Sequence, residues 1–417
     1  MFGLSAHWML HEGEPVASVA VLSHEEQRER LRGYCPEAEP VALVAGDPCF
    51  DRMLAGRPLR ESYRHRFGIR PEQRCVVVSS TWGPESLFGR DPSLVQRLSR
   101  ELPLDEYRVV VALHPNVWHG HSPWQVRTWL ADCAKAGALV LPPEEGWRAA
   151  LIAADVTVGD HSSVGFYSAA LGTPLLLASW PVHAVDPASP VAALLRATPR
   201  LSADRPLRAQ IDEVVEQHTP DRHAEITALT TSVPERSAEL LRAEIYSRMQ
   251  LPEPPEPAGA TAVPLPEQQV PDVPSQLVEV DWANASVVRH PASALGEVDG
   301  VLVAGTREPE RRWLELAEVV LDDACHEDPL HWIRSTLAAM PGCVLGTTRD
   351  RCGTWVVTGR DHPVVRLRLP PDLGAAGAAV VHEWLRLGRP EFPARLHLGR
   401  RVVELGEPSR HRRAPGC

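Results

Sequence analysis

Two adjacent serines in the middle of the chain carry the side chains best suited to binding a phosphate. The segment from Ala154 to Tyr167 reads as a buried strand, a short polar turn and a helix that begins at Ser162 and Ser163. A helix start offers unpaired backbone N–H groups and the positive end of the helix dipole, and the two hydroxyls add donors. The pattern therefore predicts a diphosphate site at this helix start. The alternative is that Ser162 only caps the helix, as serine often does.

Polar residues also follow the neighbouring strands. Ser80-Thr81-Trp82-Gly83 follows the first strand of this region, and His114-Pro115-Asn116 follows the second. Asp160 and His161 form the turn before the two serines. Because ligands of open parallel sheets bind beyond the carboxyl ends of the strands, we expect these loops to meet at one site.

His114 is the candidate for proton transfer at this edge. An imidazole titrates near neutral pH, so it could take a proton from an acceptor hydroxyl; the alternative is a histidine that only forms a hydrogen bond at the strand end. His119, His121 and His161 could add metal ligands, but they lack a helical His-x-x-x-His spacing and a carboxylate partner. We therefore expect no metal and no cofactor.

Two tryptophans near these loops could stack on a nucleobase. Trp82 lies in the first loop, and Trp147 ends the segment Glu144-Glu145-Gly146-Trp147, which leads into the helix before the serine turn. Tryptophans in helices more often pack in cores, which is the alternative for both.

The elements that must position these residues alternate regularly between Cys75 and Thr198. The predicted strands are Cys75–Ser79, Arg108–Leu113, Ala138–Leu141, Val156–Val158 and Leu175–Ala178, and the predicted helices are Pro92–Leu102, Pro123–Ala136, Glu144–Ala154 and Ser162–Leu171. Strands that are apolar throughout and separated by such helices predict an α/β fold with a doubly wound parallel sheet, covered on both faces. Helical periodicity continues over Leu207–Glu216 and Arg222–Met249.

The rest of the chain divides at changes of composition. Residues 1–50 read as a residual β-α-β piece, which either extends the following sheet or ends a domain that begins outside this chain. Residues 51–250 are the predicted α/β domain. Residues 251–275 read as a stiff, extended linker, because eight prolines lie between Pro252 and Pro274. Residues 276–407 predict a small α+β domain of unknown role, and residues 408–417 a disordered tail.

Composition disfavours several classes of function. The chain has 417 residues and a formal net charge of −11, which argues against general binding to nucleic acid or anionic lipid. No apolar run approaches the ~20 residues that a membrane helix needs, and no charged-then-apolar leader opens the chain. The eight cysteines show no Cys-x-x-Cys spacing. We therefore expect a soluble, cytoplasmic protein, with peripheral membrane contact left open.

The order of the motifs resembles a known family. Gly46-Asp47-Pro48-x-x-Asp51-x-x-Leu54, Ser80-Thr81-Trp82, His114-Pro115, Ala154-Asp155 and Gly159-Asp160-His161-Ser162-Ser163-Val164 follow one another as in the carboxyl half of CDP-glycerol glycerophosphotransferases. These are GT-B enzymes that polymerise wall teichoic acids. More broadly, Val41 to Ala178 is similar to the donor-binding half of GT-B glycosyltransferases and UDP-N-acetylglucosamine 2-epimerases.

The resemblance implies a nucleotide-diphosphate donor held by Ser162 and Ser163. It further implies that Ser80–Gly83 lines the opposite wall, that His114 is the base, and that the catalytic centre needs no metal. The sequence departs from the family pattern at three positions: Gly83 replaces an arginine, His161 a tyrosine, and Tyr167 an acid suited to a ribose hydroxyl.

Two functions follow from these patterns. The first is a GT-B-type transferase that passes glycerophosphate or sugar from CDP-glycerol or a nucleotide sugar to a hydroxyl acceptor. The second is a catalytically degenerate nucleotide-binding or regulatory protein that acts through its carboxyl-terminal domain, which the truncated first domain, Gly83 and Tyr167 favour. Epimerase chemistry would need acid–base carboxylates that the sequence does not show.

Overall fold

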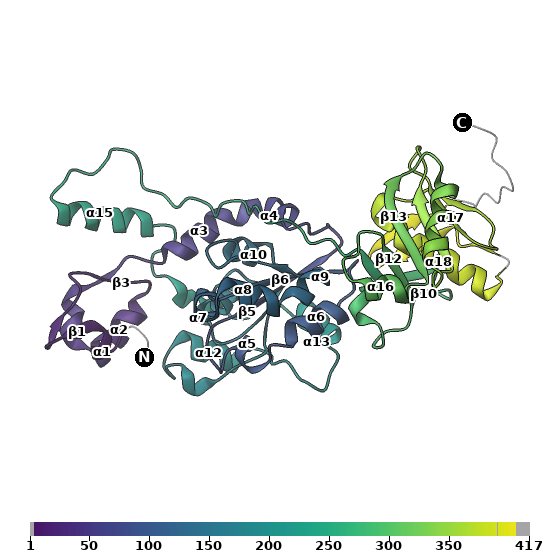
Figure 1. The fold of residues 1–417 in the computed structure, drawn as a ribbon. Coiled ribbons are helices and arrows are strands. Elements are labelled where there is room, and N and C mark those ends of the chain that lie inside the picture. Colours follow the sequence, from purple (N-terminus) through teal and green to yellow (C-terminus); the bar gives the residue numbers. More distant parts are fainter. Residues whose placement is uncertain (1–3, 390, 406–417) are drawn as a thin grey trace.

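The computed structural model describes residues 4–389 and 391–405, with a five-stranded sheet at its centre (Figure 1). The strands are β5 (Arg74–Ser80), β6 (Tyr107–Leu113), β7 (Leu139–Val140), β8 (Val156–Gly159) and β9 (Leu175–Leu177). Their order is β7-β6-β5-β8-β9, and every neighbouring pair is parallel. All five predicted strands are confirmed, and so is the doubly wound topology, because the chain adds β6 and β7 on one side of β5 and then β8 and β9 on the other.

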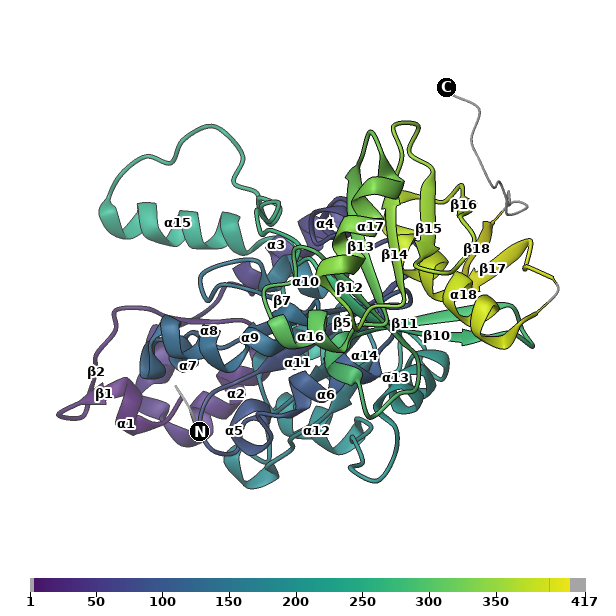
Figure 2. The same cartoon turned by 45° about the vertical axis from the view of Figure 1, so that its right-hand side comes forward.

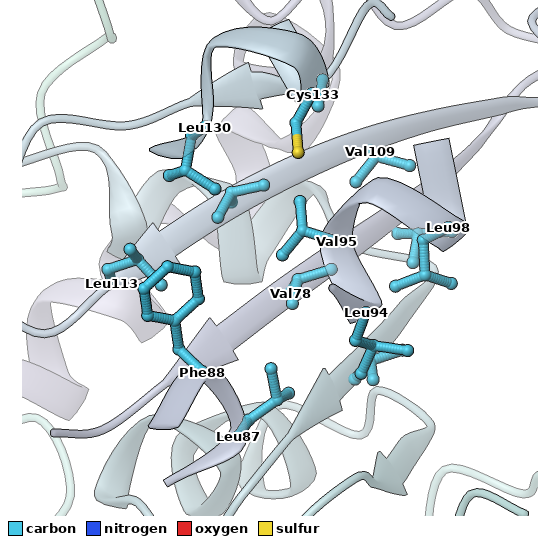
Figure 3. Packing of buried hydrophobic residues seen from close by; sticks show 14 of the residues in the cluster. Val78, Leu87, Phe88, Leu94, Val95, Leu98, Val109, Leu113, Leu130 and Cys133 are labelled. Carbon is cyan, nitrogen blue, oxygen red and sulfur yellow. The ribbon is translucent and has the colours of Figure 1, made fainter. Parts of the chain in front are cut away.

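Helices cover both faces of this sheet. Side chains of a strand alternate between its faces, so Val76 and Val78 of β5 enter one core, while Cys75 and Val77 enter the other. Figure 3 shows the first core, in which side chains of α5 (Leu87–Arg90), α6 (Leu94–Glu101) and α9 (Ala131–Lys135) pack on β5 and β6. On the other face lie α3 (Pro48–Gly56), α4 (Arg60–Arg66) and α10 (Trp147–Ala153). The uninterrupted apolar strands therefore follow from burial on both sides.

The helices differ from the predictions at several places, and α3, α4, α5 and α12 (Pro190–Ala197) were not predicted. A short helix, α7 (Pro115–His121), follows β6, where no helix was predicted. The predicted helix Pro123–Ala136 is divided at Leu130 into α8 (Pro123–Trp129) and α9. The predicted helical run Arg222–Met249 is likewise divided into α14 (Ala224–Thr227) and α15 (Ser237–Met249), with Pro234 between them. The remaining helices of the region are α11 (Ser163–Ala170), α12 (Pro190–Ala197) and α13 (Leu207–Glu216).

The first part of the chain forms a small unit of its own. In it β3 (Ala20–Leu22) and β4 (Ala42–Val44) pair in parallel and flank α2 (Glu25–Tyr34), as the β-α-β pattern predicts. The helix α1 (Ala6–Met9) and the hairpin of β1 (Leu10–His11) and β2 (Glu14–Pro15) precede them. The pair β3–β4 is a separate sheet, so the first alternative, extension of the main sheet, is wrong. Arg30 joins the unit to the α/β domain through an ion pair with Asp186 at 3.1 Å.

The proline-rich segment, residues 251–274, lies along the α/β domain, and we call it the strap. It contains no helix or strand, as expected for an extended chain. The hydroxyl of Tyr63 donates to the carbonyl oxygen of Val263 at 2.5 Å, and Val263 is buried. Val270 and Val273 lie close over Gly68 and Gly137. The expectation of a spacer between domains is therefore corrected: proline keeps the segment extended, but its apolar residues bind it to the domain surface.

The carboxyl-terminal domain is built on a nine-stranded mixed sheet of the order β16-β15-β14-β13-β12-β10-β11-β17-β18. The strands are β10 (Ser275–Asp281), β11 (Ser286–Pro291), β12 (Val301–Gly305), β13 (Val319–Cys325), β14 (Leu345–Arg349), β15 (Trp355–Gly359), β16 (Val365–Leu367), β17 (Arg395–Leu398) and β18 (Arg401–Glu404), and the helices are α16 (Arg311–Leu316), α17 (Pro329–Ala339) and α18 (Gly374–Leu387). Helix α18 packs on one face and α17 on the other. The predicted α+β character is confirmed.

A buried ion pair fixes this domain to the α/β domain. The guanidinium of Arg289 lies 2.6 Å from the carboxylate of Asp105, and both side chains are buried.

The two views show α15 lying away from the central sheet, at the end of the molecule opposite the carboxyl-terminal domain (Figure 2). The predicted tail 408–417 lies outside the described residues. Within residues 4–389 and 391–405, no helix is long and apolar enough to cross a bilayer.

Candidate functional site

The loops after β5, β6 and β8 meet at the carboxyl edge of the sheet, as the strand order predicts. The backbone N–H of His114 donates to the carbonyl oxygen of Ser80 at 2.9 Å. The backbone N–H of Thr81 donates to the carboxylate of Asp160 at 2.8 Å. These two hydrogen bonds bring His114, Thr81 and the turn before α11 together.

Asp160 holds the first of these loops in place. Its side chain is buried, and Oδ2 accepts hydrogen bonds from the backbone N–H groups of Thr81 at 2.8 Å and Leu87 at 2.9 Å, and from the hydroxyl of Ser80 at 3.3 Å. Ser80 is also buried. We expected both residues to contact the donor; instead, they lie beneath the loop and position its backbone.

Ser162 and Ser163 begin α11 and differ in what they offer a ligand. The hydroxyl of Ser162 accepts the backbone N–H of Gly165 at 3.3 Å, so its side chain is the cap that the alternative describes. Ser163 is exposed. The first N–H groups of α11 have no acceptor within the helix and carry the positive end of its dipole. An anion at this end can therefore contact backbone N–H groups and the Ser163 hydroxyl.

His114 caps α7 in a way that fixes its tautomer. Its Nδ1 accepts the backbone N–H of Asn116 at 3.1 Å, so the neutral ring carries its proton on Nε2. Burial lowers the pKa of His114, against the carboxylate of Asp160, which raises it. The ring is thus a neutral hydrogen-bond donor at pH 7, and its only acceptor nitrogen is already occupied. The side chain of Asn116 is exposed, and the residue contacts His114 only through its backbone N–H.

The loop after β5 explains one departure from the family pattern. Gly83 has a φ of +93°, and its carbonyl oxygen accepts the backbone N–H of Ser86 at 3.2 Å. Glycine adopts this conformation without strain, whereas an arginine does not. An arginine at position 83 would therefore strain this loop, which accounts for the loss of the arginine of the family pattern. Trp82, beside it, is half exposed.

Tyr167 has no negative charge of its own, but it contacts a carboxylate from another element. It lies one helical turn after Ser163, and its hydroxyl donates to Asp47 Oδ2 at 2.7 Å. Burial, and next the charge of Asp47, raise the pKa of Tyr167, so the phenol stays protonated. Its ring lies 6.2 Å, between centroids, from both Phe50 and Trp147. Trp147 therefore packs against Tyr167 in the second core, as the alternative reading of the tryptophans has it.

A cavity of about 160 Å³ opens beside Ser163 and Tyr167, between the first unit and α11 and α12. Its lining mixes polar and apolar side chains and comprises Ser23, Gln27, Arg30, Asp47, Ser163, Phe166, Tyr167, Ser189, Pro190, Val191, Leu229 and Thr230. In the sequence, Asp47 stands out only as part of a motif, and Arg30 does not stand out at all, because it is one charged residue among many in α2. His161 is half-buried, and its Nδ1 has no hydrogen-bond partner. No three His, Cys, Asp or Glu side chains of the described residues gather as metal ligands.

No protein-family model matches the sequence, and no curated protein matches it. Among solved structures, the wall teichoic acid polymerase TagF is 15% identical over 56% of this chain and 58% of its own, with a TM-score of 0.40. The UDP-GlcNAc 2-epimerase from Neisseria meningitidis is 13% identical over 56% and 61%, with a TM-score of 0.33. A glycosyltransferase from Rickettsia africae is 10% identical over 57% and 64%, also with a TM-score of 0.33.

The chain thus spans less than two thirds of the length of each of these three proteins.

Proposed function

We propose that this protein is a GT-B-type transferase. It binds a nucleotide-diphosphate donor, such as CDP-glycerol or a nucleotide sugar, and passes the glycerophosphate or sugar to a hydroxyl acceptor. The observation that carries the proposal is the amino end of α11, where the exposed Ser163 and unpaired N–H groups lie beside the loops of Thr81 and His114.

Two neighbouring regions would bind different parts of the donor: the amino end of α11 and the cavity beside it. The diphosphate would bind the N–H groups of α11, because an oxyanion is stabilised there by both hydrogen bonds and the helix dipole. The cavity of about 160 Å³ is smaller than the roughly 300 Å³ of an ordinary ligand pocket, so it would hold only one part of the donor. Its carboxylate and hydroxyl groups suit a part rich in hydroxyls.

The geometry of His114 supports a role other than the one that the sequence predicts. With Nδ1 occupied by the Asn116 N–H, the imidazole presents Nε2–H, which can donate to an oxygen of the leaving phosphate. Negative charge develops on that oxygen as the transferred group departs, and a fixed neutral donor stabilises it. We therefore assign His114 the part of a donor to the leaving group.

Titration of the full chain with CDP, UDP and their glycerol or sugar conjugates tests the proposal. A ligand at 100 times its Kd should stabilise the fold by ~2.7 kcal/mol, which raises the melting temperature. Ser163→Ala should weaken binding roughly 10- to 100-fold, the value of a hydrogen bond to a charged group of about 1.5–3 kcal/mol. Ser247→Ala, an exposed serine in α15, is the matched control. The proposal is wrong if no nucleotide binds at millimolar concentration, or if the two variants bind equally.

The second candidate function is binding without turnover. The occupied Nδ1 of His114 favours it, because a transferase that lacks this acceptor must remove the proton of the acceptor hydroxyl by another group. Incubation of a radiolabelled donor with the protein and a hydroxyl-rich acceptor separates the two candidates. Transfer that is lost in His114→Ala supports the transferase, whereas binding with no transfer in either protein supports the second candidate.

A further inference from the structure

A second cavity, of about 250 Å³, lies between the α/β domain and the carboxyl-terminal domain. The strap, the start of β6 and the start of α18 all contribute to its wall. Because β6 begins at Tyr107 and His114 follows its other end, this cavity lies at the opposite edge of the sheet from the candidate donor site. Nothing in the proposed transfer reaction uses it.

Arg108, on the wall of this cavity, is a cation without a carboxylate partner. Its Nη1 donates to the carbonyl oxygen of Gly137 at 3.1 Å and its Nη2 to that of Gly68 at 3.3 Å, while Nε is buried with no hydrogen-bond partner. No carboxylate of the described residues forms an ion pair with it. Burial, and next the charge of Arg70, lower the pKa of Arg108. The Arg108 side chain is partly buried, and a charge withdrawn from water is normally paired, so this guanidinium is available to an anion.

The carboxylates that face the cavity already have arginine partners. Asp272 and Asp323 lie 3.3 and 2.7 Å from Arg307. Asp372 lies 2.8 Å from Arg401.

Two other arginines of the cavity wall are also paired with carboxylates. Arg289 lies 2.6 Å from Asp105. Arg70 lies 3.3 Å from Asp105 and 3.2 Å from Glu72. Arg108 is the guanidinium of this wall that none of these carboxylates neutralises.

The start of α18 adds donors to the same cavity. Gly374 and Ala375, the first residues of this 14-residue helix, line it, and no side chain caps the helix at Leu373. Their N–H groups have no acceptor within the helix and carry its positive end. Gln276 and Thr306 line the cavity as well. A guanidinium and a helix start that face one cavity from two domains suit a tetrahedral oxyanion.

From these observations we infer a second anion site, in which a phosphate or a phosphoryl group binds between Arg108 and the start of α18. Such an anion would contact both domains, so it would neutralise the partly buried guanidinium of Arg108 and stabilise the association of the two domains. The inference does not depend on the proposed transferase function.

Equilibrium dialysis of the full chain against radiolabelled inorganic phosphate, at constant ionic strength in chloride, tests this site. Saturating CDP and the variant Ser163→Ala remove the contribution of the donor site. We expect saturable binding of one phosphate per chain that survives both treatments. Glycerol 3-phosphate, used as competitor, shows whether the site takes a free phosphate only or also a phosphoryl group.

Arg108→Gln keeps an amide donor but removes the charge, and should weaken phosphate binding about tenfold or more. Arg127→Gln, an exposed arginine of α8, is the control and should bind as the wild type does. If Arg108→Gln does not fold, the melting temperature of the wild type in phosphate and in chloride gives the second measurement. The inference is overturned by the absence of saturable binding in the wild type, by equal binding in the two variants, or by equal melting temperatures in the two salts.

Discussion

Replacement of Asp160 by alanine should loosen the loop after β5 and reduce nucleotide binding together with stability. The substitution removes the acceptor of two backbone N–H groups, those of Thr81 and Leu87, whereas the Ser80 hydroxyl keeps the carbonyl oxygen of Thr81 at 2.9 Å. An unsatisfied buried donor costs about 1–3 kcal/mol. Leu87 is buried and bears this cost in full, whereas water can reach the half-buried Thr81, so we expect a loss of about 2–4 kcal/mol. That is a large part of an ordinary stability of about 5–15 kcal/mol.

Urea unfolding and nucleotide titration of the same protein measure the two effects. Asp160→Asn retains a carbonyl oxygen for the two N–H groups and should lose only about 1 kcal/mol. Asp155 gives a matched control at the other end of β8, where it accepts the backbone N–H of Cys75 at 2.7 Å and pairs with Arg60 and Arg64. Asp155→Ala should destabilise the fold but leave the nucleotide Kd unchanged. An unfolding midpoint of Asp160→Ala equal to that of the wild type would refute the reasoning, as would an equal loss of affinity in both alanine variants.

Three further predictions concern other parts of the molecule. The pKa of His114 is lower in the folded protein than its ordinary value of 6.5 in the unfolded chain. As the pH falls below 6.5, the unfolded chain therefore binds a proton that the folded protein does not, and the folded protein loses stability. His114→Ala should therefore lose less stability than the wild type between about pH 7.5 and about pH 5, and equal losses in urea midpoints would contradict this. Asp105→Ala leaves Arg289 buried without its partner and should cost about 3–5 kcal/mol, seen as early release of the carboxyl-terminal domain in limited proteolysis. Tyr63→Phe removes the hydrogen bond to Val263 at a cost of about 1 kcal/mol and should speed cleavage within the strap, unlike Tyr34→Phe, whose hydroxyl is exposed.

The central sheet could be predicted because its signal is local and repeated. Each strand is a short apolar run, each is followed by a helical period, and a parallel sheet places all the following loops at one edge. That rule alone brings Thr81, His114 and the α11 start together. The sequence therefore determines where the candidate site lies more firmly than what each side chain does there.

The roles of the side chains depend on contacts between distant residues. Tyr167 meets Asp47 across 120 residues of chain, which no periodicity shows. The tautomer of His114 depends on α7, although His114 followed by a proline at the first helical position was a signal for a capped helix. The polar turn suggested that Asp160 binds the donor, but in the folded protein its carboxylate accepts the backbone N–H groups of Leu87 and Thr81 instead.

The strap shows a different limit. Its prolines exclude a helix and predict an extended chain, but they do not say which surface the chain follows. Val263 was the sign available in the sequence, since an apolar residue within a run of prolines can be buried on a neighbouring domain, as it is here.

A crystal structure of the protein soaked with CDP or CDP-glycerol tests the central claim most directly. We expect electron density for the diphosphate at the amino end of α11, with an oxygen ~3 Å from the backbone N of Ser163 and another within reach of His114 Nε2. A nucleotide bound elsewhere on the chain, with the α11 start empty, would contradict it.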